Sequence, residues 1–292
     1  MKKFVCLGAL AALTLINVAP MFAQAAAAAA DAPPPMLFIY REMVRAGKVP
    51  AHDANERAWA AAHAKAKVPV NFLAMTTVVG PAEAWYLSPV ASWGGWQKQQ
   101  DETSAIAGWN DSNAKFQAAD ADLISNSVGI MARYRPALSY RAKGNLSGYR
   151  YVMVDIYRIK PGHEAEFAEG WRMQVEAHTK ANMDESWAIY QVDSGMPQGT
   201  FMYLQAIKSF DEVDKSGEMH GADAFRDAVG EGGRAKMREM TRSAIDSSMR
   251  LYFALDPNQS VVPQSWIDAD AKFWTPKPLP PAVPAAKKPG NQ

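Results

Sequence analysis

The apolar and polar positions alternate most clearly over residues 149–162, YRYVMVDIYRIKPG. This run is rich in β-branched and aromatic side chains and ends at a Pro-Gly pair, so it predicts a strand followed by a turn. The apolar period then lengthens to three or four residues, which predicts a helix over 163–182. The residues on the apolar face of that helix are Phe167, Trp171, Val175 and His178.

The spacing of apolar residues also predicts the elements in the rest of the chain. Downstream it predicts strands at 185–193, 200–208 and 249–255, with helical segments between 209 and 247 that break near the glycines at 230–233. Upstream it predicts strands at 36–45, 70–79, 84–91 and 130–140, and helices at 50–66, 95–107 and 113–128. Each half therefore has the order β-α-β-β-α-β, which is that of a ferredoxin-like unit.

Short matches between the halves predict an internal repeat. The pairs are 62–66 with 177–181 at an offset of 115, then 85–87 with 202–204 and 133–138 with 250–255 at an offset of 117. One insertion of two residues in the turn 195–199 explains the change of offset.

The predicted fold class is α+β, with two tandem ferredoxin-like units whose antiparallel sheets pack together as an α/β barrel within one chain. Helices on one side of a four-stranded sheet leave its other side open, and two units can cover each other there. The predicted division is a signal peptide at 1–25, a disordered Ala/Pro linker at 26–35, units at 36–145 and 146–256, and a C-terminal arm with a Pro-rich tail at 257–292.

Two segments carry a resemblance to a known group of proteins. They are IYRIKPGHEAEFAEGW and MYLQAIKSFDEVDK, each in the second half. The chain resembles the dimeric α/β-barrel superfamily over about residues 36–255, including its NIPSNAP-like and antibiotic-biosynthesis-monooxygenase-like families. The resemblance implies a barrel fold, but the superfamily includes oxygenases, haem enzymes, isomerases and proteins of no known reaction.

Alternation predicts which side chains of the strand at 149–160 face the barrel. Val152, Val154 and Ile156 are assigned to the helix-covered face, so Asp155 and Tyr157 are expected to point into the interior. A buried carboxylate needs a partner or a raised pKa, which makes Asp155 a catalytic candidate. The alternative is a solvated or salt-bridged residue near a strand end. Its candidate partners are Arg41 and Arg158.

Aromatic residues on the predicted strands are the ligand-binding candidates. Tyr86 and Tyr203 occupy equivalent positions in the two halves and are expected to line a pocket as hydroxyl donors. The alternative is that these large side chains only fill space in the core. The full set of ligand-binding candidates is Trp85, Tyr86, Tyr157, Trp187, Tyr190 and Tyr203.

Three of the five histidines need an explanation. His63 and His178 recur with matching flanks at equivalent helix ends, which favours a structural role at the edge of the core. His220 aligns with Thr103 in the repeat, so the first half has no equivalent histidine. Because haem-binding branches of the superfamily use a helix-borne histidine, the resemblance makes His220 a candidate axial ligand. The alternative is a surface histidine, and without a clustered ligand motif we predict no metal site and no cofactor.

The N-terminal sequence and the cysteine content indicate the compartment in which the protein is expected to act. Two lysines precede an apolar run at 4–18 and an A-x-A site, which is typical of a secretory signal peptide. Its removal takes away Cys6, the only cysteine, so the expected product is secreted or periplasmic, without disulfides and off the membrane. With 31 basic and 30 acidic residues, nothing favours nucleic acid as a partner, while a homo-oligomer stays open.

Three functions remain open, and the sequence leaves undecided whether the protein is an enzyme. The favoured hypothesis is an exported protein that binds a small apolar or aromatic molecule in the barrel. The alternative is a cofactor-independent, monooxygenase-like oxidoreductase or, less favoured, a haem-dependent one. The third is an assembly module that uses its Pro-rich tail as a spacer.

Overall fold

The computed structural model describes residues 31–277. The predicted signal peptide, the first residues of the predicted linker and the Pro-rich tail from 278 onward lie outside the described residues. Within residues 31–277, no helix is both long enough and apolar enough to cross a bilayer.

The two halves contain the same order of elements. The first consists of β1 (Met36–Val44), α2 (Val49–Lys65), β2 (Leu73–Val79), β3 (Glu83–Val90), α3 (Trp93–Ser104), α4 (Trp109–Asp120) and β4 (Ile124–Tyr134). The second consists of β5 (Tyr151–Ile159), α5 (Glu164–Lys180), β6 (Ala188–Ser194), β7 (Thr200–Ile207), α6 (Asp211–Gly221), α7 (Asp223–Ala244) and β8 (Ile245–Leu255). The 3-10 helix η1 (Pro136–Leu138) links the halves, and α8 (Gln264–Ala269) and α9 (Ala271–Trp274) follow them.

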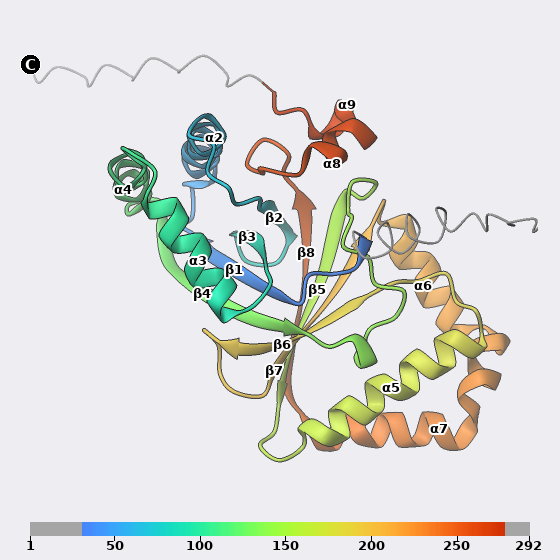
Figure 1. Cartoon of the computed structure of the whole chain (residues 1–292). Helices are drawn as coiled ribbons and strands as arrows, with labels where there is room; N and C mark the ends of the chain where they lie inside the picture. Colours follow the sequence, from blue (N-terminus) through green and yellow to red (C-terminus); the bar gives the residue numbers. More distant parts are fainter. Residues whose placement is uncertain (1–30, 278–292) are drawn as a thin grey trace, which may run out of the picture.

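The strands form one closed antiparallel barrel in the order β1-β3-β2-β8-β5-β7-β6-β4, which confirms the predicted fold class. The halves join edge to edge, because β2 pairs with β8 and β4 pairs with β6. Helices α2, α3 and α4 lie outside the barrel on one side, and α5, α6 and α7 lie outside it on the other (Figure 1). Closure removes every free sheet edge.

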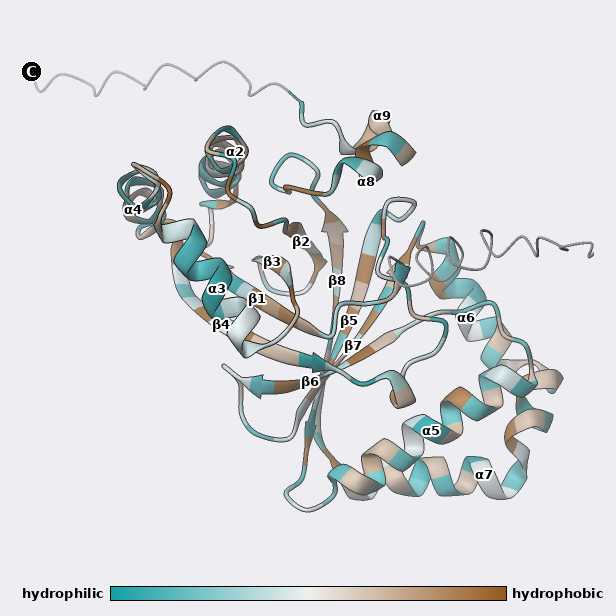
Figure 2. Ribbon diagram, viewed as in Figure 1, coloured by the Kyte–Doolittle hydropathy of each residue, from teal (hydrophilic) through white to brown (hydrophobic). Residues whose placement is uncertain are grey.

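Apolar side chains fill the middle of the barrel. Ile39, Met75, Trp85, Met202 and Phe253 are completely buried there, and the strands of the barrel carry brown, hydrophobic stretches in Figure 2. Burying a side chain of this size stabilises the fold by about 1.5–3 kcal/mol relative to leaving it exposed. The barrel is therefore a packed core along this layer and not an open tube.

One ion pair lies within this apolar interior. Arg41 contacts Glu83 at 2.6 Å, and the indole Nε1 of Trp85 donates a hydrogen bond to the same carboxylate at 2.8 Å. The guanidinium also lies 5.2 Å from the centroid of the Trp85 ring. Arg41 is thus fully engaged by Glu83 and is not a partner of Asp155.

The predicted facing of the strand at 149–160 is wrong. Val152, Val154 and Ile156 pack in the barrel interior, whereas Met153 and Tyr157 pack outside against Phe167 of α5. The physical reason is that a closed barrel shuts water out of its inner face completely, while the helices leave polar margins on the outer face. The more uniformly apolar side therefore belongs inside.

Element bounds give the offset between the halves directly. It is 115 for β1 with β5 and for α2 with α5, and 117 for β3 with β7. The strand registers pair Met36 with Arg133 and Tyr151 with Ala254, so Arg133 corresponds to Ala254 at an offset of 254 − 133 = 121. The predicted match of 133–138 with 250–255 at 117 is therefore wrong, because the region of α7 adds residues before the last strand.

Both ends of the described chain are fixed to the barrel. Residues 31–35 were expected to belong to a disordered linker, but Pro34 and Pro35 accept hydrogen bonds from Tyr190 Oη at 3.0 Å and Tyr134 N at 2.9 Å. At the other end, Trp274 is 1% exposed and its Nε1 donates to the Ser147 carbonyl at 2.9 Å. Helices α8 and α9 thereby cover part of one mouth of the barrel (Figure 1).

Candidate functional site

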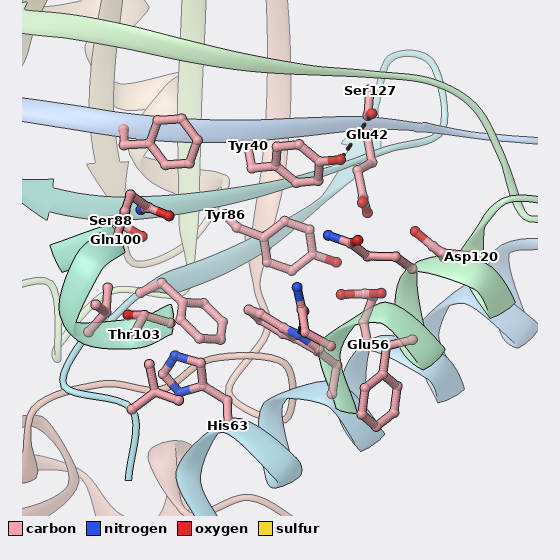
Figure 3. A pocket seen from close by; sticks show the side chains of 18 of the residues that line it. Tyr40, Glu42, Glu56, His63, Tyr86, Ser88, Gln100, Thr103, Asp120 and Ser127 are labelled. Atoms are coloured by element: carbon pink, nitrogen blue, oxygen red, sulfur yellow. Dashed lines mark hydrogen bonds between the residues drawn. The ribbon is translucent and has the colours of Figure 1, made fainter. Parts of the chain in front are cut away.

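A pocket of about 620 Å³ lies between the outer face of the first-half sheet and helices α2, α3 and α4. Its walls include the aromatic side chains of Phe38, Tyr40, Trp59, Phe72, Tyr86, Trp96, Trp109 and Phe116. Figure 3 shows Glu42, Glu56 and Asp120 gathered at one end, His63 at the opposite end and Tyr86 between them. This size and lining are typical of a site for a small molecule.

Four ionisable side chains form a buried cluster at the first end: Glu42, His52, Glu56 and Asp120. The β1 strand carries Glu42 on its outer face, and α2 places His52 and Glu56 one turn apart on the face toward the sheet. Asp120 is the last residue of α4. The His52 Nε2 lies 2.8 Å from Glu42 Oε2 and 3.9 Å from Asp120 Oδ1. One ligand atom from each of the four lies within 4.8 Å of the others.

The crowding of these groups changes their proton affinities. Burial, with the negative charges of Glu42 and Asp120, raises the pKa of Glu56 to about 8. Burial and the charge of Glu42 raise the pKa of Asp120 to about 6. Burial by itself lowers the pKa of His52, but the hydrogen bond and charge of Glu42 raise it overall. Near pH 7 the cluster therefore offers a protonated acid at Glu56 and a carboxylate at Asp120.

The opposite end of the pocket is apolar around one histidine. The His63 ring lies 5.2 Å from the Phe72 centroid and 5.4 Å from those of Trp59 and Trp109. Burial lowers the pKa of His63 to about 4, so its imidazole is neutral at ordinary pH. A neutral imidazole can donate or accept one hydrogen bond at each nitrogen according to its tautomer.

Three pocket residues carry buried polar atoms that have no hydrogen-bond partner within the described part of the chain. These atoms are Asp120 Oδ1, His63 Nδ1 and Trp96 Nε1. Buried polar atoms in folded proteins are nearly always paired, and leaving one unpaired costs about 1–3 kcal/mol. Their concentration around one cavity indicates a bound molecule or ordered water that satisfies them.

The six aromatic candidates do not all line one cavity. Trp85 and Tyr190 face the barrel interior, whereas Tyr157, Trp187 and Tyr203 pack outside it beneath α5. Of the six, Tyr86 alone lines the pocket beneath α2, and its hydroxyl donates to Gln259 Oε1 at 3.2 Å.

A second hollow of about 860 Å³ lies at the mouth of the barrel that α8 partly covers. Tyr190 and Trp187 line it, together with Leu37, Leu87 and Trp266. Its walls hold no cluster of ionisable side chains like the one at Glu56. This second hollow could hold an apolar molecule at the barrel mouth. The pocket beneath α2 differs from it because several polar groups converge there.

Asp155 is buried at the outer face and is held by an ion pair. Arg250 donates to both of its carboxylate oxygens at 2.7 Å, and Tyr157 Oη donates at 3.0 Å. The salt-bridged alternative therefore describes Asp155, but with Arg250 in place of the expected Arg41 or Arg158. A carboxylate satisfied on both oxygens has little capacity left for a substrate.

His220 lies on α6 beside two residues of the same half. Its Nε2 is 3.0 Å from Glu185 Oε2 and 3.1 Å from His178 Nε2. These neighbours occupy the side of the nitrogen that an axial haem iron would need, and His220 lines neither of the two hollows described above. The residues present do not fit a haem at this position.

The acidic cluster was not predicted from the sequence. Glu42 and Asp120 are charged residues in unremarkable surroundings, so nothing local marks them as buried. One signal was present: His52 and Glu56 are four residues apart, which places both on one face of the predicted helix at 50–66. The group formed by His178, Glu185 and His220 was missed as well, because its members come from three separate segments.

No family model matches the sequence, and no curated protein is significantly similar to it. Among solved structures, similar ones include a "putative monooxygenase" from Fusobacterium nucleatum (14% identity, TM-score 0.49), covering 76% of this chain and 93% of that one. An anthrone oxidase-like protein (7%, 0.48) covers 75% and 90%. A mutant chlorite dismutase from Candidatus Nitrospira defluvii (7%, 0.44) covers 83% and 97%. Similarity this low carries no information about the activity of this chain.

Proposed function

We propose that the pocket beneath α2, α3 and α4 binds a small aromatic molecule that carries a hydroxyl group at one end and a hydrogen-bond acceptor at the other. The supporting observation is the set of three unpaired buried atoms on its walls. Asp120 Oδ1 accepts the ligand's hydroxyl proton, and Trp96 Nε1, which can only donate, requires an acceptor. The aromatic walls provide the apolar contact area.

The experiment compares ligands that differ by one polar group. We expect naphthalene-sized phenols, such as a naphthol or a hydroxynaphthoquinone, to quench tryptophan fluorescence at lower concentrations than naphthalene does. Asp120→Asn should weaken naphthol binding about tenfold, because an amide oxygen accepts a weaker hydrogen bond than a carboxylate does, and leave naphthalene binding unchanged.

Asp122→Asn is the matched control, because Asp122 is exposed two residues further along the chain. This variant should bind both ligands as the wild type does. Equal loss of both ligands in Asp120→Asn would mean that the pocket has collapsed. Unchanged naphthol binding in that variant would contradict the proposed orientation.

A second function is supported by the two shifted carboxyl groups. With pKa values of about 6 at Asp120 and about 8 at Glu56, the pocket holds a base and an acid on either side of neutral pH. In this hypothesis Asp120 removes a hydroxyl proton of an electron-rich phenol such as a hydroquinone. The phenolate passes two electrons to dissolved oxygen and loses its second proton, so that the quinone and hydrogen peroxide are the products. The protein would then be a cofactor-independent oxidoreductase.

Oxygen consumption separates this function from simple binding. The enzyme hypothesis predicts uptake with naphthols or hydroquinones that rises with pH through about 6, as Asp120 ionises, and that is lost in Asp120→Asn. Binding without oxygen uptake across such a panel would reject the enzyme and retain the binding protein.

A further inference from the structure

The second half holds a compact set of three potential metal ligands on its outer side. His178 lies near the end of α5, His220 near the end of α6, and Glu185 in the segment that leads into β6. His178 and Glu185 are buried, whereas the side chain of His220 is 40% exposed. This set is separate from the pocket in the first half.

The three nearest atoms form an almost regular triangle. The distances are 2.9 Å from His178 Nε2 to Glu185 Oε2, 3.0 Å from Glu185 Oε2 to His220 Nε2, and 3.1 Å between the two Nε2 atoms. An ion held at about 2.1 Å from three ligands on one octahedral face separates those ligands by about 3.0 Å. The edges of the observed triangle match that separation.

The hydrogen bonding of His178 supports an ion in the same place. Its Nδ1 lies 2.7 Å from the carbonyl oxygen of Gln174, and because a carbonyl can only accept, Nδ1 carries the proton. In a ring that carries its single proton on Nδ1, Nε2 presents a lone pair to a carboxylate oxygen and to a second imidazole nitrogen. Lone pairs meet lone pairs unless a proton or a cation lies between them. Metal-binding histidines typically donate their other nitrogen to a carbonyl in this way.

The surroundings hold the three groups in position and leave one side open. The Trp187 ring lies 4.6 Å from that of His178, and Phe225 lies 5.0 Å from both imidazoles. Ser216 Oγ donates to the other oxygen of Glu185. The partial exposure of His220 gives the triangle access to solvent, so water or a small ligand can complete the coordination of an ion.

We propose that His178, Glu185 and His220 bind one divalent first-row transition ion that accepts octahedral ligation, such as ferrous iron, for which zinc can substitute. Two imidazoles and one carboxylate favour this class over magnesium or calcium, which prefer oxygen ligands. The site leaves open positions, as in catalytic rather than closed structural centres. Its existence does not depend on what the first-half pocket binds.

The test is a metal titration of the purified full-length protein after treatment with a chelator. Wild-type protein should bind one equivalent of Zn²⁺ by calorimetry, and Co²⁺ should produce visible d–d bands that Zn²⁺ abolishes. Glu185→Gln and His220→Gln should each weaken binding by at least about 100-fold, because each removes a direct ligand. Zn²⁺ should raise the melting temperature of the wild type and not that of either variant.

His163→Gln is the surface control, because His163 is a half-exposed histidine immediately before α5. It should bind as the wild type does, and so should His52→Gln, which alters the buried cluster of the first half. Circular dichroism of metal-free His220→Gln should match the wild type, since the half-exposed side chain is not needed for folding. No stoichiometric binding by the wild type would overturn the proposal. Binding lost in His52→Gln but kept in His220→Gln would also overturn it.

Discussion

The two halves of the barrel have the same elements but distribute polarity in opposite ways. Glu42, His52 and Glu56 of the first half correspond, at an offset of 115, to Tyr157, Phe167 and Trp171 of the second. The first trio is buried, ionisable and next to a hollow. The rings of the second trio pack on one another with centroids 5.6–6.3 Å apart.

The opposite end of each half shows the reverse exchange. His63, Val70 and Thr103 of the first half line the far end of the pocket, and they correspond to His178, Glu185 and His220 of the second. Both halves have a histidine near the end of their first helix. His63 is neutral and surrounded by aromatic rings, whereas His178 belongs to the triangle formed with Glu185 and His220. The fold fixes where side chains meet, and the sequence of each half decides what chemistry occurs there.

Phe167→Ala is expected to have the largest effect, because it removes the centre of the packed outer face of the second half. Phe167 is 5% exposed and lies 4.8 Å from the Phe201 ring. We expect the free energy of unfolding in urea to fall by about 3–5 kcal/mol. Phe116→Ala, on the wall of the first-half pocket, should cost less than half as much because a cavity already exists beside it. Equal losses would mean that the first half is as well packed as the second.

Glu56→Gln tests the ionisable trio through pH. The pKa of Glu56 is raised from 4.5 to about 8, so the folded state binds a proton that the unfolded state has released between these values. Wild-type stability should therefore fall as pH rises from about 5 to 8. The variant should lack the part of this fall that Glu56 contributes and be more stable at pH 8 by on the order of 3 kcal/mol.

Urea unfolding at pH 5, 6.5 and 8 measures this difference. Glu176→Gln is the control, since Glu176 is exposed on α5 and should leave the pH dependence as it is. A wild-type protein whose stability is level or rises across this range would show that Glu56 ionises normally.

His63→Phe tests the apolar end of the same pocket, and it should change the stability of the protein at acidic pH. Burial lowers the pKa of His63 from 6.5 to about 4, so the unfolded state takes up a proton first as pH falls. This histidine makes the wild type lose stability between about pH 6.5 and 4. A phenylalanine fits the aromatic surroundings and does not titrate, so the variant should retain about 2 kcal/mol more of its stability at pH 4. An unchanged acid limb would show that His63 is solvated.

The sequence predicted the order of elements because that order depends on local periodicity. It failed at β4, where residues 124–128 were expected to end a helix but begin the strand Ile124–Tyr134. The sequence ISNSV there has few apolar residues, because its outer side lies at the pocket and in solvent. With only Ile124 and Val128 apolar, this stretch is too polar to show the alternation that marks a half-buried strand.

The candidate site was harder to predict than the fold. Which side of a strand faces inward depends on tertiary structure. Because Val152 and Val154 were assigned to the outer side of the sheet, Asp155 and Tyr157 were wrongly predicted to point into the barrel. Asp120 becomes a site residue only because α4 ends against α2, a contact that neither segment encodes locally. Tyr86 was identified because an equivalent tyrosine stands at 203, which is a signal that a repeat provides within one sequence.

The smallest expected effect concerns the one ion pair on the outer face of β5. Asp155 and Arg250 correspond to Tyr40 and Gly129, so the first half has no charged pair at these positions and instead joins Tyr40 Oη to Ser127 Oγ at 3.0 Å. Arg250→Met should cost about 1 kcal/mol, since Arg250 is more than half exposed and water can replace it, while Tyr157 Oη still donates to Asp155.

Tyr40→Phe should cost about 0.5–1 kcal/mol, the value of one hydrogen bond at a partly exposed site. The loss in Arg250→Met should shrink in 1 M salt, because an exposed charge pair is screened, whereas the loss in Tyr40→Phe should not. Urea unfolding at low and high salt measures both. A loss of several kcal/mol in Arg250→Met at both salt concentrations would contradict this expectation. It would mean that Asp155 and Arg250 form a buried ion pair, and that the outer face of the second half contains buried charge as that of the first half does.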